Sequence, residues 1–102
     1  MKIPIPKSIP VGGHIYKVRL VRNLFKDTAE SAQCLYWSEQ INIDTDVPSL
    51  TESFIHEVFH AVDRIYNNHS LSEDTVDALA EGWFQVLSDM GITFTEPGGE
   101  PV

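Results

Sequence analysis

Two histidines and a glutamate stand in the pentapeptide His56-Glu57-Val58-Phe59-His60, at a spacing that could support metal-dependent chemistry. Histidines four residues apart on a helix lie one turn above each other on the same face, so both imidazoles can bind one metal ion. The glutamate between them points to the side of that pair, where it can accept a proton from zinc-activated water. The pattern therefore predicts a zinc hydrolase, in particular a peptidase, with His56 and His60 as Zn2+ ligands and Glu57 as the general base.

The residues around this motif are apolar, as a buried metal-binding helix requires. Phe54 and Ile55 precede the motif, and Ala61 and Val62 follow it. This pattern predicts a helix from about Thr51 to Asn67. The alternative is that both histidines are core side chains with satisfied hydrogen bonds and that the glutamate is a surface carboxylate. The shared helical face of the histidines and the apolar neighbours favour the metal site.

A third protein ligand is needed, because three ligands leave one position of a catalytic zinc site open. The candidates are acidic residues of a second predicted helix, from about Ser72 to Met90. On a helical wheel Glu73 lies at the border of the apolar stripe, whereas Asp77 and Glu81 lie farther round. An antiparallel pair of helices would instead bring Asp77 or Glu81 closer to the level of the histidines. Glu73 is the preferred third ligand, and Glu81 and Asp77 stay open as alternatives.

Other polar residues could assist such a site. Asp63 follows His60 by three residues and is expected either to orient a zinc-binding imidazole or to be a surface carboxylate. Hydrolysis also needs a group that stabilises the oxyanion of the tetrahedral intermediate. The sequence offers several candidates for this role, whose alternative role is packing: Tyr36, Tyr66 and His69.

The length of 102 residues predicts one domain spanning residues 1–102. The net charge of −8 and the lack of any run of Lys or Arg argue against nucleic acid as a partner and leave a peptide or protein substrate. The single cysteine, Cys34, cannot form an internal disulfide and is expected to be a buried small side chain. No signal peptide or membrane-spanning segment is expected, which favours the cytoplasm.

The remaining chain predicts a small sheet ahead of the two helices. Three prolines make residues 1–10 an extended leader, and two prolines and two glycines make residues 95–102 an irregular tail. In the strand nearest the leader, Tyr16, Val18 and Leu20 form the apolar side. The pattern indicates an α+β domain with a small three-stranded antiparallel sheet followed by a two-helix hairpin. The predicted strands are His14–Val21, Gln33–Trp37 and Gln40–Asp44.

Three features of the sequence resemble known metallopeptidases. HExxH followed by a helical glutamate resembles the gluzincins, whose small single-domain versions are called minigluzincins. The stretch Glu73–Ala80 is similar to the E-x-x-A-x-x-F-A pattern of ImmA/IrrE-type metallopeptidases, with Val76 and Leu79 in place of Ala and Phe. The segments Ile9–Val18 and Leu79–Leu87 are similar to short metallopeptidase-like proteins of phages and prophages.

This resemblance implies a zincin-like helical hairpin that binds zinc through His56, His60 and Glu73, with Glu57 as the catalytic base. It also implies that the edge strand of the sheet lies beside the cleft and binds an extended peptide by strand addition. Gln40–Asp44 is the expected edge strand. By analogy with ImmA-type proteins the protein could cleave a repressor, and a phage-encoded protein would act in the host cytoplasm.

A second function stays open beside hydrolysis. A phage-type binding module could keep zinc on a zincin scaffold and bind a host factor without cutting it. The small size of the chain favours this alternative, because it leaves little room for substrate pockets. Glu57 argues against it, because a purely structural zinc site has no use for a general base.

Overall fold

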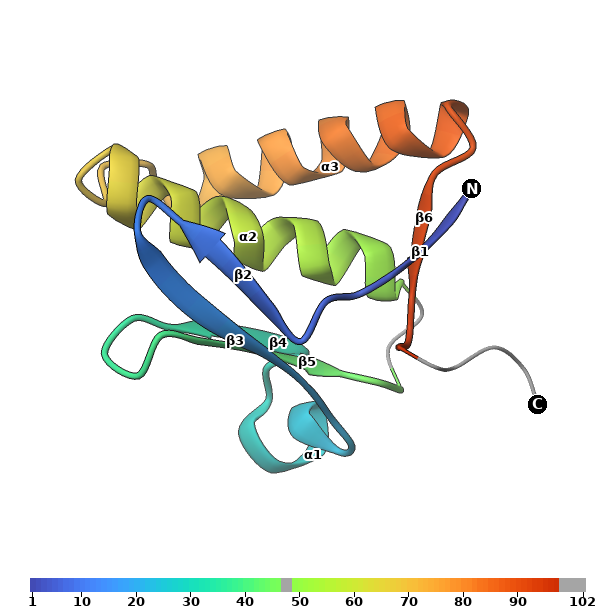
Figure 1. Cartoon of the computed structure of the whole chain (residues 1–102), viewed down its shortest axis with the longest axis horizontal. Coiled ribbons are helices and arrows are strands. Elements are labelled where there is room, and N and C mark those ends of the chain that lie inside the picture. The colour runs from blue at the N-terminus through green and yellow to red at the C-terminus, as the bar shows by residue number, and fades with distance from the viewer. Residues whose placement is uncertain (47–48, 98–102) are drawn as a thin grey trace.

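The computed structural model describes residues 1–46 and 49–97 (Figure 1). The described part folds as an α+β domain, which confirms the predicted class. In chain order its elements are β1 (Lys2–Pro4), β2 (Ser8–Val11), β3 (His14–Val21), α1 (Leu24–Thr28), β4 (Ala32–Leu35), β5 (Gln40–Asp44), α2 (Leu50–Tyr66), α3 (Glu73–Asp89) and β6 (Thr93–Thr95).

The main sheet has four strands in the order β2-β3-β5-β4. β2 and β4 are antiparallel to their neighbours, whereas β3 and β5 run parallel to each other. The predicted three-stranded antiparallel sheet is therefore wrong in strand number and in one strand direction. The added strand comes from the leader, which turns through Gly12 and Gly13 into β3. The parallel pair arises because the chain passes through α1 and β4 before β5 returns beside β3.

The two ends of the described chain also form strands. β1 and β6 pair in parallel, with Ile3 opposite Phe94, and make a separate two-stranded sheet. The leader is extended, as predicted, but it is hydrogen-bonded structure in both β1 and β2. The predicted irregular tail begins at Thr95, which is the last residue of β6, and residues 98–102 of that tail lie outside the described part.

The core lies between the main sheet and α2. Tyr16 and Val18 of β3 are buried, which confirms the predicted apolar side of this strand. Ile41 and Ile43 of β5 are fully buried and belong to the same cluster, together with Ala61 of α2. Burying each of these large side chains contributes about 1.5–3 kcal/mol relative to leaving it exposed.

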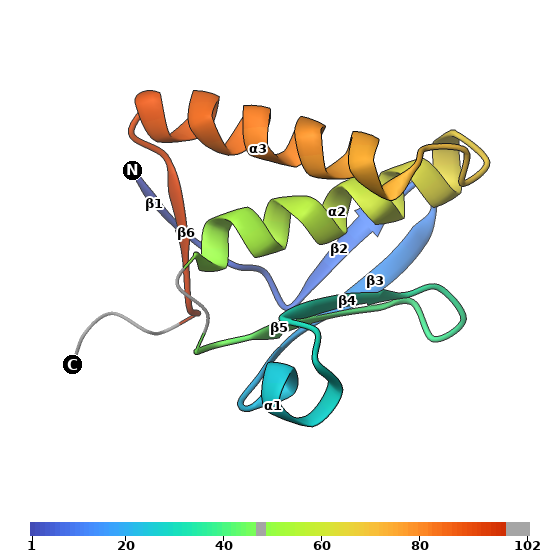
Figure 2. The same ribbon diagram turned by 180° about the vertical axis from the view of Figure 1, so that it is seen from behind.

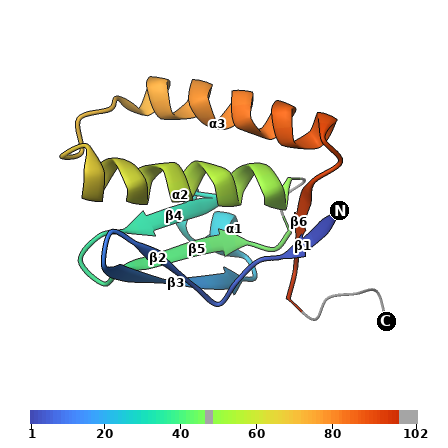
Figure 3. The ribbon, with the colours of Figure 1, turned by 45° about the horizontal axis from the view of Figure 1, so that its top comes forward.

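Helix α2 forms a middle layer between the main sheet and α3 (Figure 3). α3 runs back antiparallel over α2 and forms the outer layer (Figures 1 and 2). The boundaries predicted for these helices differ from the observed ones by one residue at each end. Both helices begin with a serine whose hydroxyl accepts a backbone hydrogen bond in the first turn, Ser49 for α2 and Ser72 for α3.

The start of α2 is tied to β6 by one side chain. The hydroxyl of Thr51 accepts a hydrogen bond from the backbone N–H of Phe94 at 2.9 Å and lies 3.2 Å from the carbonyl oxygen of the same residue, to which it donates. The rings of Phe54 and Phe94 pack next to this link with centroids 5.0 Å apart. This contact fixes the N-terminal end of α2 against the small sheet.

Replacing Thr51 by valine should lower the free energy of unfolding by about 1–3 kcal/mol, because the partly buried N–H of Phe94 would lose its partner. Denaturant unfolding of wild type and variant measures this change. Thr93→Val is the matched control on an exposed position of β6 and should change stability by less than about 0.5 kcal/mol. Equal unfolding midpoints for wild type and Thr51→Val would contradict this role of the link.

Candidate functional site

Helix α2 places its motif at the edge of the core. Phe54 and Ala61 point into the cluster under the sheet, and this fixes the rotation of the helix. His56 and His60 then lie on the side of α2 that faces the start of α3, and their rings pack edge to face with centroids 4.8 Å apart. The side chains of both histidines are mostly buried, at 20 % and 14 % exposed.

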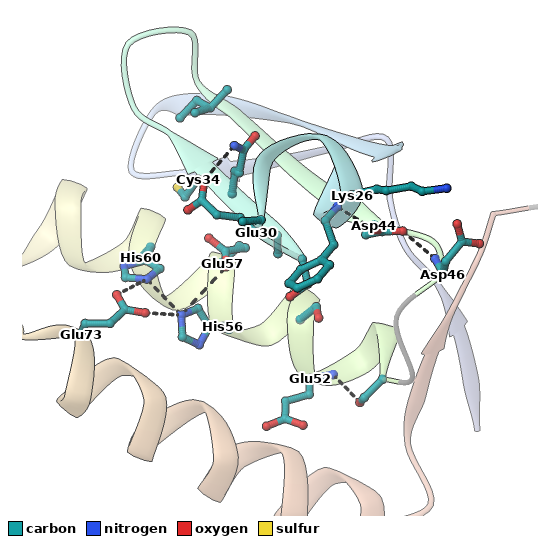
Figure 4. A pocket seen from close by; sticks show the side chains of 18 of the residues that line it. Lys26, Glu30, Cys34, Asp44, Asp46, Glu52, His56, Glu57, His60 and Glu73 are labelled. Atoms are coloured by element: carbon teal, nitrogen blue, oxygen red, sulfur yellow. Dashed lines mark hydrogen bonds and ion pairs between the residues drawn. The ribbon is translucent and has the colours of Figure 1, made fainter. Parts of the chain in front are cut away.

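The carboxylate of Glu73 lies between the two imidazoles (Figure 4). Its Oε1 is 2.9 Å from Nε2 of His56, and its Oε2 is 3.1 Å from Nε2 of His60. The two Nε2 atoms are 3.1 Å apart. Among the described residues, these three side chains form the one group of His, Cys, Asp and Glu whose ligand atoms converge, all within 4.8 Å of one another. The residues predicted as metal ligands are thus brought together by the fold.

The other two candidates for the third ligand lie elsewhere. Asp77 is 3.3 Å from Nδ1 of His56, which is the ring nitrogen that does not face Glu73. Glu81 is exposed and belongs to no convergent group in the described part of the chain. The antiparallel hairpin was expected to bring Asp77 or Glu81 closer to the level of the histidines; it does bring Asp77 to His56, but neither residue belongs to the convergent group of the described residues. Glu73 reaches His60, six residues before the end of α2, because the chain doubles back over the last turns of α2 before α3 begins.

Asp63 organises this reversal of the chain. Its side chain is buried, and its carboxylate accepts hydrogen bonds from the side-chain amide of Asn67 at 2.9 Å and from the backbone N–H of Leu71 at 3.3 Å. Its backbone carbonyl accepts hydrogen bonds from the N–H groups of Asn67 and His69. Asp63 is therefore neither a surface carboxylate nor a hydrogen-bond partner of His56 or His60, and both expectations for it are wrong. Nδ1 of His60 is buried without a hydrogen-bond partner among the described residues.

A carboxylate that orients a histidine of the motif was expected at Asp63, and Asp77 has this position instead, next to Nδ1 of His56. A carboxylate on Nδ1 fixes the tautomer of an imidazole and leaves Nε2 free for another ligand. The signal in the sequence is the spacing: Asp77 follows Glu73 by four residues, as His60 follows His56. In two antiparallel helices these matching spacings allow Glu73 to contact His60 while Asp77 contacts His56. The position of Asp77 next to His56 could therefore have been predicted from the sequence.

Glu57 is buried beside the histidines, with 6 % of the residue exposed and Oε2 3.9 Å from Nε2 of His56. Burial raises the pKa of Glu57 to about 8, and the negative charges of Glu73, Glu30 and Asp77 add to this effect. Burial also lowers the pKa of His60, partly opposed by Glu73. The pocket thus favours a neutral Glu57 and a neutral His60 until positive charge enters it.

A cleft of about 1220 Å³ opens over these residues. Its walls are α2, strand β4 and the segment from α1 to β4, and its lining includes Glu30, His56, Glu57, His60 and Glu73. Figure 4 shows Glu57 pointing from α2 toward the side of the cleft where Glu30 and Cys34 lie.

The strand beside the cleft is β4, which is one of the two edge strands of the main sheet. The prediction that Gln40–Asp44 forms the edge is wrong, because this strand is β5 and lies between β3 and β4. The burial of Asn42 and Asp44 on the face opposite the two core isoleucines is consistent with this central position. Within residues 1–46 and 49–97, no strand pairs with the other edge of β4.

Four further residues named from the sequence can be placed. Burial raises the pKa of the Cys34 thiol to about 12, which fits a neutral side chain rather than a nucleophile. Tyr36 and His69 line the cleft and contact each other with ring centroids 5.0 Å apart. Tyr66 is 70 % exposed and does not line the cleft.

Comparisons of the chain with protein-family models, with curated proteins and with solved structures find no match. In the part of the chain described here, the helices are too short and too polar to cross a bilayer.

The raised pKa of Glu57 predicts a pH-dependent stability in protein stripped of metal by a chelator. Folded protein keeps the Glu57 proton between the ordinary pKa of 4.5 and about 8, so it binds more protons than the unfolded chain in this window. The lowered pKa of His60 has the opposite effect below its ordinary value of 6.5, so the stability should fall most clearly as the pH rises from 6.5 to 8. Glu57→Gln should remove most of this slope and stabilise the stripped protein at pH 8 by about 1–3 kcal/mol.

Thermal unfolding in chelator across this pH range measures the effect. Glu52→Gln is the matched control, because Glu52 lies five residues earlier on the same helix and is only half-buried. The control should keep the wild-type slope. A wild-type slope in Glu57→Gln would mean that Glu57 does not hold a proton in the folded pocket.

Proposed function

We propose that this protein is a zinc-dependent metallopeptidase with a zincin-like helical pair. The observation that carries the proposal is the convergence of His56, His60 and Glu73, with Glu57 buried beside them in an open cleft. His56, His60 and Glu73 would hold the zinc, and Glu57 would be the catalytic base. The substrate would be a peptide or a protein segment.

The donor set fits zinc by its chemistry and by its spacing. Two imidazole nitrogens and one carboxylate oxygen form a ligand set that catalytic zinc uses. Two nitrogens about 2.0–2.1 Å from one tetrahedral zinc lie about 3.3–3.4 Å apart, and the two Nε2 atoms here are 3.1 Å apart. Asp77 on Nδ1 of His56 supports the fit, because a metal-binding histidine commonly donates its other N–H to a carboxylate.

When bound, Zn2+ would supply a Lewis acid that polarises a carbonyl group and lowers the pKa of water. Glu57 would take a proton from the attacking water and return it to the leaving amine. With positive charge beside it, this carboxyl would have a pKa below 8 and would be ionised for the first of these steps. Tyr36 and His69 line the same cleft, so either side chain could donate a hydrogen bond to the developing oxyanion.

The free edge of β4 would bind the substrate. The outward N–H and C=O groups of an antiparallel edge strand can pair with an extended peptide, which then lies along the strand. β4 forms one wall of the cleft over Glu57, so a peptide on this edge would pass the catalytic base. Hydrolysis of extended peptide segments is the activity that this arrangement supports best.

Metal content tests the ligand set. Wild-type protein should contain about one zinc per chain by elemental analysis, because three converging donors suffice for a tight site. Glu73→Ala should lose this zinc, whereas Glu81→Ala should keep it, although both glutamates are exposed residues of the same helix. Loss of zinc in Glu81→Ala alone, or a wild type that binds no zinc after reconstitution, would contradict the proposed site.

Activity tests the role of Glu57. Zinc-loaded wild type should cleave members of a peptide library, with products identified by mass spectrometry. Glu57→Gln should keep its zinc but cleave about 100- to 10,000-fold more slowly, because a general base contributes a factor of this size. Glu81→Gln, on an exposed position of α3 outside the lining of the cleft, should cleave at the wild-type rate. Cleavage that survives Glu57→Gln would reject this mechanism, and zinc binding without any cleavage would favour the binding module.

A further inference from the structure

The lining of the cleft over Glu57 is unbalanced in charge. It contains six carboxyl groups, one lysine, Lys26, and no arginine. Side chains of one sign along the walls of a cleft attract ligands of the opposite sign and repel ligands of the same sign. A peptide that enters this cleft is therefore selected by its charge. The six acidic residues are Glu30, Asp44, Asp46, Glu52, Glu57 and Glu73.

Four of these six carboxyl groups already have partners or a role. Asp44 accepts two backbone hydrogen bonds, and Asp46 lies 3.9 Å from the guanidinium group of Arg22. Two more belong to the proposed zinc site. Glu30 and Glu52 remain, and within residues 1–46 and 49–97 neither of them forms a salt bridge. These two carboxylates are the ones that a charged ligand could pair with.

Glu30 is held beside the proposed catalytic base. Its Oε1 accepts a hydrogen bond from the side-chain amide of Gln33 at 3.0 Å. Its negative charge is close enough to contribute to the raised pKa of Glu57. In Figure 4 Glu30 and Glu57 reach into the same part of the cleft, whereas Lys26 extends away from them. Glu52 lies five residues before Glu57 on α2, so Glu30 is the unpaired carboxylate on the Glu57 side of the cleft.

The register of β4 places a bound peptide next to Glu30. The N–H of Asp44 donates to the carbonyl oxygen of Ser31 at 2.9 Å, and β4 continues antiparallel to β5 from this pair. Residues alternate in an antiparallel ladder, so Ala32 and Cys34 carry their N–H and C=O groups on the edge of β4 that faces away from β5. Glu30 lies two residues before Ala32, where this edge begins. A peptide paired with the edge would therefore bring a side chain to Glu30.

We propose that Glu30 makes the cleft select peptides with Lys or Arg beside the bond that is cleaved. The ammonium or guanidinium group of such a side chain would donate hydrogen bonds to the carboxylate of Glu30. An acidic side chain at the same place would be repelled, which adds to the discrimination. This inference names the substrate class of the proposed peptidase, and it rests on that proposed function.

Binding to a variant that cannot cleave separates the inference from the activity. The probes are three dye-labelled decapeptides of serine and alanine that have lysine, norleucine or glutamate at the centre. Norleucine keeps the aliphatic stem of lysine without its charge. In buffer with zinc, Glu57→Gln protein should bind the lysine peptide about tenfold more tightly than the norleucine peptide, and the glutamate peptide most weakly. Fluorescence anisotropy measures the three affinities.

Variants in the same background identify the carboxylate. Glu30→Gln should make the lysine and norleucine peptides bind equally, because the amide keeps an oxygen for the hydrogen bond with Gln33 but loses the charge. Glu30→Lys should reverse the preference in favour of the glutamate peptide. Asp27→Asn is the matched control, because Asp27 is an exposed acidic residue of α1 that does not line the cleft. It should keep the preference for lysine, which should decrease as salt is added.

Several results would overturn the inference. These are no binding of any of the three peptides, equal binding of the lysine and norleucine peptides, and a preference for lysine that survives Glu30→Gln. Loss of the preference in Asp27→Asn would assign it to the net charge of the protein. Loss in Glu52→Gln but not in Glu30→Gln would assign it to Glu52.

Protein with Glu57 intact distinguishes this inference from the proposed function. Cleavage with no preference for lysine would leave the peptidase in place and reject the role of Glu30. Binding that depends on Glu30, without any cleavage, would keep the selection of basic peptides and reject hydrolysis. Cleavage next to lysine that Glu30→Gln slows about tenfold, and that Asp27→Asn leaves unchanged, would support both.

Discussion

The structure depends on a single helix, α2, which packs against the main sheet, α3 and β6 on different sides. Phe54 and Ala61 pack under the main sheet, and contacts with β6 and α3 cover further sides of the same helix. Every rotation of α2 that kept its apolar residues buried would also keep His56 and His60 together on the side of α3. The hydrophobic core therefore sets the orientation of the candidate site, and the site cannot be repositioned without repacking the core.

The second constraint is electrostatic. Glu57, Glu73 and Asp77 surround two imidazoles, and in the described part of the chain these carboxylates form ion pairs with histidines alone. Three carboxyl groups outnumber two imidazoles, and burial together with this excess of acidic groups raises the pKa of Glu57. A divalent cation would remove this excess.

Sequence reasoning succeeded where the pattern was local. The 3.6-residue period gave both long helices to within one residue, and the same-face spacing of His56 and His60 follows from that period alone. It failed where partners are distant in the chain: the pairing of β3 with β5, the central place of β5 and the role of Asp63 depend on contacts that no local pattern encodes. The sequence favoured Glu73 as the third ligand but could not exclude Asp77 and Glu81. The reason is that the connection held by Asp63 sets which residue of α3 lies beside the histidines, and this connection could not be predicted.

The pairing of β1 with β6 joins the two ends of the described chain. Contacts between residues this far apart in sequence close a long loop and form slowly, because the chain entropy must be lost before the contact is made. Thr51 binds β6 in the same place, so the start of α2 reaches its final position only when the last strand arrives. Assembly of the pocket would then be a late event in folding, and incomplete chains would lack a finished binding cleft.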